Sequence, residues 1–390
     1  MIDSAFNLII SYADKNVAIV LVYANIMNMN KQYLLNQALE PLRRMSSYFS
    51  NRKYVNRLSM SCSNKQKLSK EQKASIQSYY KNHMGKKLPD YKWHEYYYCM
   101  TGHFSEKYIP NYVIERINRK IYNYNITTAL DDKNLYYVLF PDICQPKALL
   151  QCVNGFYYIN NSPVSKEVAL RDCENLGEVI IKPSFCSCSG NGVKKLIING
   201  GREERSGRTL SSIIDEYGNN FVIQEVIRQH DELARLCSTS INTVRIVTYR
   251  RSSSEIAVVY SVMRIGKKGS EIDNTTAGGF VCKISDDGLL DKYAVTPGSD
   301  KKYTCNEDGL IFENYQIPMY DAIVEKSKQM HYKMPHLLMV GWDFTVNESS
   351  EVVFIEMNAP FGLVLHQLAA GPGYGEYTDE IFDFCFKKNK

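Results

Sequence analysis

Two carboxylates and an amide lie close together near the C-terminal end of the chain, in two apolar stretches that are typical of strands. Asp343 lies in LLMVGWDFTV, and Glu356 and Asn358 lie in EVVFIEMN. A turn at residues 347–350 would pair the two strands antiparallel, with Asp343 opposite Glu356, and Glu356 and Asn358 would share one face. Oxygen ligands of this kind suit Mg²⁺, with substrate phosphates completing its shell. The alternative is an ordinary hairpin with a polar outer side, which the cost of burying carboxylates without a cation disfavours.

A lysine stands at the end of a second apolar stretch, before a loop of small residues. The segment EVIIKPSFCSCSGNGVKKLII is typical of a strand, a loop at 184–193 and another strand, with Lys182 closing the first strand. Backbone N–H groups of such a loop, together with a lysine, can hold nucleotide phosphates. A plain connection between strands is the alternative, since the motif is not a P-loop. The candidate loop residues are Ser189, Gly190 and Gly192, and Cys186 and Cys188 are either reactive thiols or small residues that let the loop close.

The third candidate is the stretch NFVIQEVIRQHDE, a strand that Gln224 and Glu225 interrupt before Val226 and Ile227 resume it. Its side chains and backbone could hydrogen-bond an adenine edge. The two acids that follow, Asp231 and Glu232, could accept hydrogen bonds from ribose hydroxyls. An amphipathic strand with exposed acids is the alternative.

Two arginines lie inside β-rich stretches, Arg245 in INTVRIVTYR and Arg264 in VMRIG. Arginine within a strand suits bidentate capture of a carboxylate or phosphate better than it suits surface decoration.

The elements that must position these residues follow from hydrophobic periodicity. Ser69 and Gln72 predict a capping box, with Gly85 ending that helix, and a further helix is expected at 111–122. After about residue 149 short β-rich stretches follow one another, with a helix near 319–332 and a last helix from about 378. Strands grouped in meanders with intervening helices indicate an α+β fold.

Composition narrows the class of protein. The 390 residues are 44% apolar and 23% charged, which excludes collagen-like and wholly disordered chains. Residues 1–150 carry a net charge of +10 and the remainder −5, so the first part could meet phosphates, nucleic acid, anionic glycans or a membrane surface.

Eleven scattered cysteines without a CxxC pair fit neither a disulfide framework nor a zinc ribbon. The apolar run 17–27 is shorter than the roughly 20 residues that a membrane span needs, and the start does not resemble a signal peptide. We therefore expect a cytoplasmic protein with no membrane span and no nucleic-acid partner.

Taken in order, these motifs resemble the ATP-grasp superfamily: KP before a small-residue loop, QEVI, an arginine strand, and Asp343 thirteen residues before Glu-x-Asn. The stretches IIKPSFCSCSGNGV, QEVIRQH, INTVRIVT, RIG…DNTTAGG and VGWD are similar to its sugar-transfer-associated branch. The resemblance covers about 125–375. It implies an ATP-grasp domain at 125–390 behind a mainly helical region at 1–124 that binds acceptor or partner. Within that domain it implies a nucleotide-binding part at about 175–235, a metal-binding part at 236–376 and a final helix at 377–390.

The resemblance also implies a role for each candidate residue. Lys182 would contact ATP phosphates beneath the 184–193 lid, and Gln224 to Ile227 would contact adenine. Asp231 or Glu232 would bind ribose, and Arg245 and Arg264 would stabilise the transferring phosphoryl group or anchor a carboxylate. Asp343, Glu356 and Asn358 would bind two Mg²⁺ ions, or Mn²⁺ in their place.

The expected activity is that of an Mg·ATP-dependent ligase that joins a carboxylate to an amine through an acylphosphate in surface polysaccharide biosynthesis. Other polysaccharide-assembly enzymes are its expected partners. A kinase acting on a sugar or alcohol would use the same site. A non-catalytic nucleotide- and glycan-binding module is the third possibility. The sequence leaves the substrates and the oligomeric state open.

Overall fold

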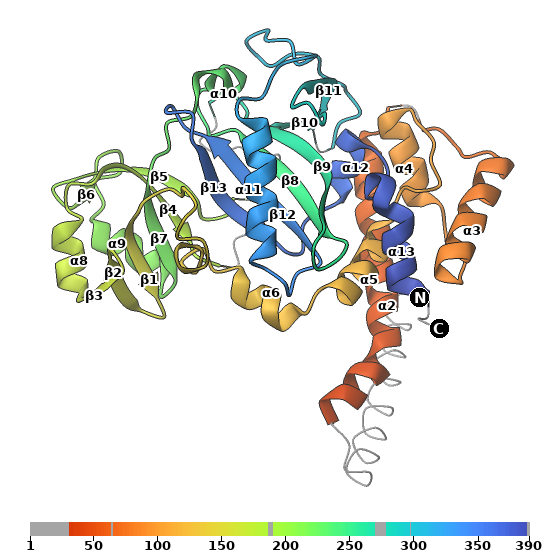
Figure 1. Ribbon diagram of the computed structural model, residues 1–390, viewed down its shortest axis with the longest axis horizontal. Helices are drawn as coiled ribbons and strands as arrows, with labels where there is room; N and C mark the ends of the chain where they lie inside the picture. The colour runs from red at the N-terminus through yellow and green to blue at the C-terminus, as the bar shows by residue number, and fades with distance from the viewer. Residues whose placement is uncertain (1–30, 64, 186–189, 270–277, 297, 388–390) are drawn as a thin grey trace.

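Two antiparallel sheets and a group of helices make up the molecule (Figure 1). The computed structural model describes residues 31–63, 65–185, 190–269, 278–296 and 298–387, and only the backbone of 31–44. In Figure 1 the first sheet lies at the left, the second at the centre, and most N-terminal helices at the right. The predicted α+β class is confirmed.

The first sheet has seven strands in the order β3-β2-β1-β7-β4-β5-β6. Helices α8 and α9 accompany it, and its core of buried side chains, including Ile181, Ile213 and Phe221, is its own. The elements are β1 (Ala148–Val153), β2 (Phe156–Ile159), β3 (Ser162–Val164), α8 (Lys166–Asp172), β4 (Gly177–Pro183), β5 (Lys194–Asn199), β6 (Arg202–Glu203), α9 (Leu210–Tyr217) and β7 (Phe221–Glu225).

The second sheet has six strands in the order β11-β10-β9-β8-β12-β13. Helix α11 packs against β8, β9 and β12, and α12 packs against β9 and β10. The elements are α10 (Asp231–Leu236), β8 (Thr243–Arg250), β9 (Ile256–Ile265), β10 (Phe280–Ile284), β11 (Leu290–Val295), α11 (Tyr320–Tyr332), β12 (Met339–Val346), β13 (Val352–Asn358), α12 (Val364–Ala370) and α13 (Thr378–Phe386), with a 3₁₀ turn η3 (Gly375–Tyr377).

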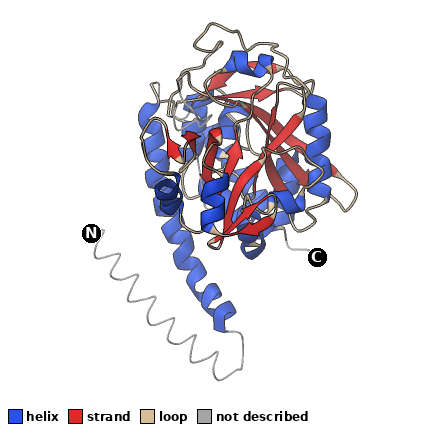
Figure 2. Ribbon diagram, turned by 90° about the vertical axis from the view of Figure 1, so that its left-hand side faces the viewer, coloured by secondary structure: helices blue, strands red, loops and turns tan. Residues whose placement is uncertain are grey.

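The N-terminal helices share a hydrophobic core with the second sheet. Buried Ile114 and Ile117 belong to the same cluster as Ile246 of β8 and Phe382 of α13. Helix α2 packs on α4 and α5, and its first half extends away from the body (Figures 1 and 2). The helices are α2 (Lys31–Leu58), α3 (Lys70–Met84), α4 (Lys92–Thr101), α5 (Asn111–Ile121), α6 (Tyr124–Leu130) and α7 (Tyr136–Leu139), with a 3₁₀ turn η1 (Ser59–Ser61).

Local sequence signals located several elements correctly. Ser69 Oγ accepts from the Gln72 N–H at 3.2 Å, and the Gln72 side chain accepts from the Ser69 N–H at 2.8 Å, so the predicted capping box is confirmed. Gly85 ends that helix with φ 67°. The predicted continuation of β7 through 226–227 is wrong, because its ladder with β4 ends at the pair Val179–Glu225. The division of the chain at residue 124 stays a prediction. Within the described ranges no helix is long and apolar enough to cross a membrane.

The segment that joins the two sheets is held by one buried asparagine. The Asn242 side chain donates to Gln229 Oε1 at 2.9 Å and to the carbonyls of Leu233 and Cys237 at 2.8 Å. Its oxygen accepts from the Gly266 N–H at 3.3 Å. Asn242 is fully buried, so it fixes where the chain leaves the first sheet and enters β8.

We predict that Asn242→Leu lowers the free energy of unfolding by about 3 kcal/mol or more, because it leaves buried acceptors without a donor. Urea denaturation monitored by circular dichroism measures this change. Asn82→Leu, an exposed position on α3, serves as the control and should change little. Equal stabilities of the two variants would contradict the role given to Asn242.

Candidate functional site

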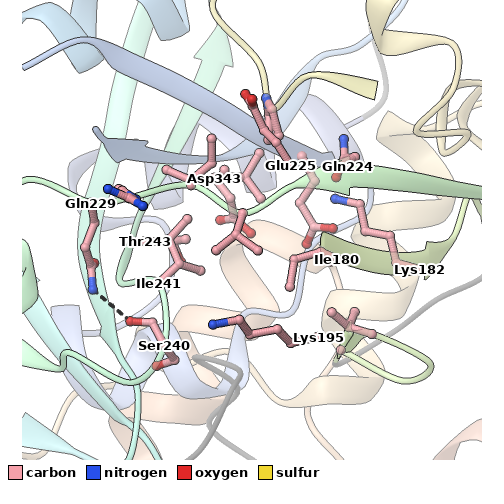
Figure 3. Close-up of a pocket in the computed structure, with 18 of the residues that line it drawn as sticks. Ile180, Lys182, Lys195, Gln224, Glu225, Gln229, Ser240, Ile241, Thr243 and Asp343 are labelled. Carbon is pink, nitrogen blue, oxygen red and sulfur yellow. Dashed lines mark hydrogen bonds between the residues drawn. The ribbon is translucent and has the colours of Figure 1, made fainter. Parts of the chain in front are cut away.

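A cavity of about 420 Å³ lies between the two sheets (Figure 3). Strands β4, β5 and β7 supply one wall, and β8, β9, β12 and β13 supply the other. Of the sequence-predicted residues, the following line it: Lys182, Gly190, Gln224, Glu225, Val226, Ile227, Arg264, Asp343 and Glu356.

The wall formed by the first sheet follows from strand alternation. Ile180 and Lys182 are two residues apart on β4 and therefore share a face. Ile180 pairs with Gln224 of β7 on one side and with Lys195 of β5 on the other, so all four side chains line the cavity (Figure 3). Lys195 also forms an ion pair with Glu178 at 2.9 Å. A cationic and partly apolar surface results.

Two buried lysines approach one carboxylate at the end of this wall. Lys182 is 7% exposed and Lys133 is 4% exposed, and Lys133 Nζ lies 3.7 Å from Glu356. Burial lowers the pKa of Lys182 to about 8, the positive charge of Lys133 acts in the same direction, and Glu356 opposes both. The two cations therefore lie where an additional anion would stabilise them.

On the opposite wall, three charged residues lie side by side on the adjacent strands β8, β12 and β13. Asp343 of β12 pairs in register with Arg245 of β8 and with Glu356 of β13, as the sequence predicted for Glu356. The Arg245 guanidinium donates to both oxygens of the Asp343 carboxylate, from Nε to Oδ1 and from Nη2 to Oδ2, and the second distance is 2.5 Å. Arg264 donates to the same carboxylate at 3.0 Å. One carboxylate thus holds two guanidinium groups.

The electrostatic state of Asp343 is set by these partners. Burial acts to raise the pKa of Asp343, but the charges of Arg245 and Arg264 outweigh it and hold that pKa below its usual value. Gly341 leaves room for the pair, since a Cβ there would lie 3.4 Å from Arg245 Cδ and 3.2 Å from Phe361 Cβ. Arg264 lines the cavity, whereas Arg245 is only 8% exposed and is not among the lining residues.

Of the residues predicted to bind Mg²⁺, Glu356 and Asn358 could offer oxygens to a divalent cation, whereas the Asp343 carboxylate is already neutralised by Arg245 and Arg264. Glu356 pairs in register with Asp343 on the neighbouring strand, and both residues line the cavity. The Asn358 Nδ2 atom is buried with no hydrogen-bond partner, and exchanging the amide nitrogen and oxygen would place an oxygen at that position. Among the described residues no three His, Cys, Asp or Glu side chains are grouped closely enough to hold a metal ion, and the metal-binding role of Asp343, Glu356 and Asn358 stays a prediction.

The end of β7 and the two residues after it line the cavity between the two sheets. Gln224 is buried and donates to the Tyr137 hydroxyl, and Glu225 accepts from the Lys147 N–H at 2.9 Å. Val226 and Ile227 line the cavity outside the strand. Their predicted contact with adenine stays a prediction.

The two acids expected near ribose lie at the start of α10, and neither is among the cavity-lining residues. Glu232 accepts from the Tyr315 hydroxyl at 2.5 Å and pairs with Arg235 at 2.9 Å. Asp231 is exposed. The structure therefore does not bring these two residues together with the others.

The predicted lid is described only at its ends. Ser189, Cys186 and Cys188 lie outside the described residues, as does the DNTTA part of the DNTTAGG motif. Gly190 lines the cavity. The Gly192 carbonyl accepts from the Tyr217 hydroxyl at 2.7 Å, and its φ of 78° favours glycine. The closing motion of the loop stays a prediction.

Sequence reasoning missed several residues that line the cavity. Lys195 and Glu178 could have been found, because alternation along β4 and β5 places them on the face of Lys182. Lys133 lies in a short segment with no periodic signal, and its backbone N–H donates to the Ser184 carbonyl at 2.7 Å. The remaining missed residues include Thr243 and the segment 238–241.

Comparison with known proteins identifies the family of the chain. Residues 113–381 match the family described as sugar-transfer associated ATP-grasp. The chain belongs to this family. The predicted ATP-grasp fold is thereby confirmed, and the family match begins earlier than the resemblance at about 125, within α5. No protein with a curated description matches the chain.

Several solved structures of ligases are distantly similar. The VanG D-Ala:D-Ser ligase of Enterococcus faecalis is 17% identical with a TM-score of 0.39, over 66% of this chain and 61% of that one. An L-amino acid ligase from Bacillus licheniformis is 13% identical with a TM-score of 0.37, over 67% and 49%. D-alanyl-alanine synthetase A of Vibrio cholerae is 11% identical with a TM-score of 0.38, over 66% and 64%. The chain thus spans less than two thirds of the length of each.

We predict that Lys133→Met raises the pKa of Lys182 above 8, because it removes a nearby positive charge, whereas Glu356→Gln lowers that pKa further. Nuclear magnetic resonance titration of ¹³C-methylated lysines measures both values. Lys194→Met, an exposed lysine on β5, is the matched control and should leave Lys182 unchanged. A Lys182 pKa that stays fixed or falls in Lys133→Met would contradict the described proximity.

Proposed function

We propose that the protein is an Mg·ATP-dependent ligase that joins a carboxylate to an amine through an acylphosphate. The supporting observation is that one cavity has two buried lysines at one wall and the Asp343–Glu356 pair at the other. Cations that bind phosphate and carboxylates that bind Mg²⁺ are both needed for phosphoryl transfer.

In the transfer of the γ-phosphoryl group of ATP, each of these side chains has its own role. Lys182 and Lys133 bind and neutralise ATP phosphates, and the backbone at 226–227 contacts the adenine. Asp343, Glu356 and Asn358 would hold Mg²⁺, as one ion or as two, or Mn²⁺ in its place. Bound there, Mg²⁺ neutralises charge on the phosphates.

The two arginines have different roles in this proposal. Arg264 reaches the cavity and contacts the transferring phosphoryl group or the acceptor carboxylate. Arg245 is a positioning residue, because its buried bidentate pair fixes the Asp343 carboxylate.

The proposed reaction has two steps. A carboxylate oxygen bonds to the γ-phosphorus of ATP as its bond to the bridging oxygen breaks, which gives an acylphosphate and ADP. An amine then bonds to the acyl carbon, phosphate leaves, and the nitrogen loses one proton. Exclusion of water by the two walls limits hydrolysis of the acylphosphate. We propose that a sugar or an amino acid carries the carboxylate, in surface polysaccharide biosynthesis. The words sugar-transfer associated in the family description support the link to sugars.

Hydroxylamine trapping tests this function. Purified protein with Mg·ATP and a panel of uronic acids and amino acids should release ADP and form a hydroxamate with its substrate. Lys182→Met should lower the rate roughly 100-fold or more, because a fixed cation on the phosphates is lost. Lys292→Met, which replaces an exposed lysine on β11, is the matched control.

The other outcomes separate the alternatives. Release of ADP with a phosphorylated alcohol and no hydroxamate would show a kinase. Nucleotide binding without release of ADP across the panel would favour a non-catalytic nucleotide- and glycan-binding module.

A further inference from the structure

The outward side of α2 and η1 exposes apolar and cationic side chains together. Met45 is 45% exposed, Phe49 51% and Met60 81%. Met45 and Phe49 lie one helical turn apart on α2, and Phe49 is about 120° round the helix from buried Val55, whereas Met60 lies in η1. Three exposed cations accompany them: Arg52, Lys53 and Arg57. We call the six residues Met45, Phe49, Arg52, Lys53, Arg57 and Met60 the basic face.

Few acidic residues accompany the positive charge of this region in the sequence. Residues 45–92 contain eleven Lys and Arg against two Asp and Glu, and no acid occurs between 45 and 70. In the described part of the chain, none of the three cations of the basic face forms an ion pair with a carboxylate. Arg57 lies over the Tyr54 ring, 5.5 Å from its centroid. Arg251, by contrast, pairs with both Glu255 and Glu380.

The exposed apolar side chains of the basic face indicate which kind of polyanion it binds. Cations alone would suit nucleic acid, an anionic glycan or lipid headgroups. Phe49, Met45 and Met60 alternate with the cations along one face, and exposed apolar groups gain from entering the acyl boundary of a bilayer. A phosphate backbone offers them no such environment. We propose that the basic face binds the surface of a membrane rich in anionic lipids.

The fold connects the basic face rigidly to the cavity. Helix α2 packs on α4, and α4 packs on α12, which begins six residues after Asn358. A membrane held at the basic face would therefore have a fixed orientation relative to the site. The inference does not depend on the proposed ligase activity, because binding to lipid is measured without ATP.

Vesicle co-sedimentation of the full chain tests the proposal. The protein should sediment with vesicles of phosphatidylcholine and phosphatidylglycerol, less with phosphatidylcholine alone, and less as salt rises. The variant Arg52→Gln/Lys53→Gln/Arg57→Gln should bind on the order of a hundredfold more weakly, at roughly fivefold for each cation lost.

Matched variants separate charge at this face from charge in general. Arg171→Gln/Lys292→Gln/Lys301→Gln removes three exposed cations elsewhere and should bind like wild type. Phe49→Ser should also weaken binding, with net charge unchanged. Circular dichroism checks that each variant is folded.

Several results would overturn the proposal. One is equal loss of binding in both triple variants, and another is binding to neutral vesicles as tight as to anionic ones. Binding of the basic face to single-stranded DNA but not to vesicles would assign it to nucleic acid. A dimer that the Phe49→Ser variant abolishes, without vesicle binding, would assign it to a second copy of the chain.

Discussion

The buried Asp343 carboxylate is the charge around which the second sheet is arranged. It lies on a central strand, 1% exposed, where an unpaired carboxylate would be costly. Arg245 from β8 and Arg264 from β9 pair with it, so three strands are tied together by charge as well as by the ladder. Removing the Asp343 carboxylate would leave the buried Arg245 guanidinium without its counter-charge, a change that strongly destabilises proteins.

This constraint explains why the cavity has two unlike walls. Asp343 is already paired, so negative charge available to a ligand comes mainly from Glu356, and positive charge comes from Lys182, Lys133 and Arg264. The first sheet has its own hydrophobic core, whereas the second shares its core with the N-terminal helices. The two walls therefore belong to separately packed bodies, joined by the segment that Asn242 fixes.

The sequence allowed prediction of those parts of the site that depend on short-range order. Antiparallel pairing across a short turn places Asp343 opposite Glu356, and the structure has this register. The same reasoning failed where contacts are long-range. Lys133 reaches Glu356 across more than 200 residues of chain, and no local pattern marks it. Glu232 was expected near ribose, yet Tyr315 and Arg235 contact its carboxylate. Spacing alone did not indicate which acids face the cavity.

The central claim is that Mg·ATP binds between the lysine wall and the carboxylate wall. Calorimetric titration with a non-hydrolysable ATP analogue, with and without Mg²⁺, tests it most directly in wild type, Lys182→Met and Glu356→Gln/Asn358→Ala. The account predicts that Mg²⁺ strengthens binding in wild type and Lys182→Met but not in the double variant, and that Lys182→Met binds at least about tenfold more weakly than wild type. Equal affinity and equal dependence on Mg²⁺ in all three proteins would contradict it.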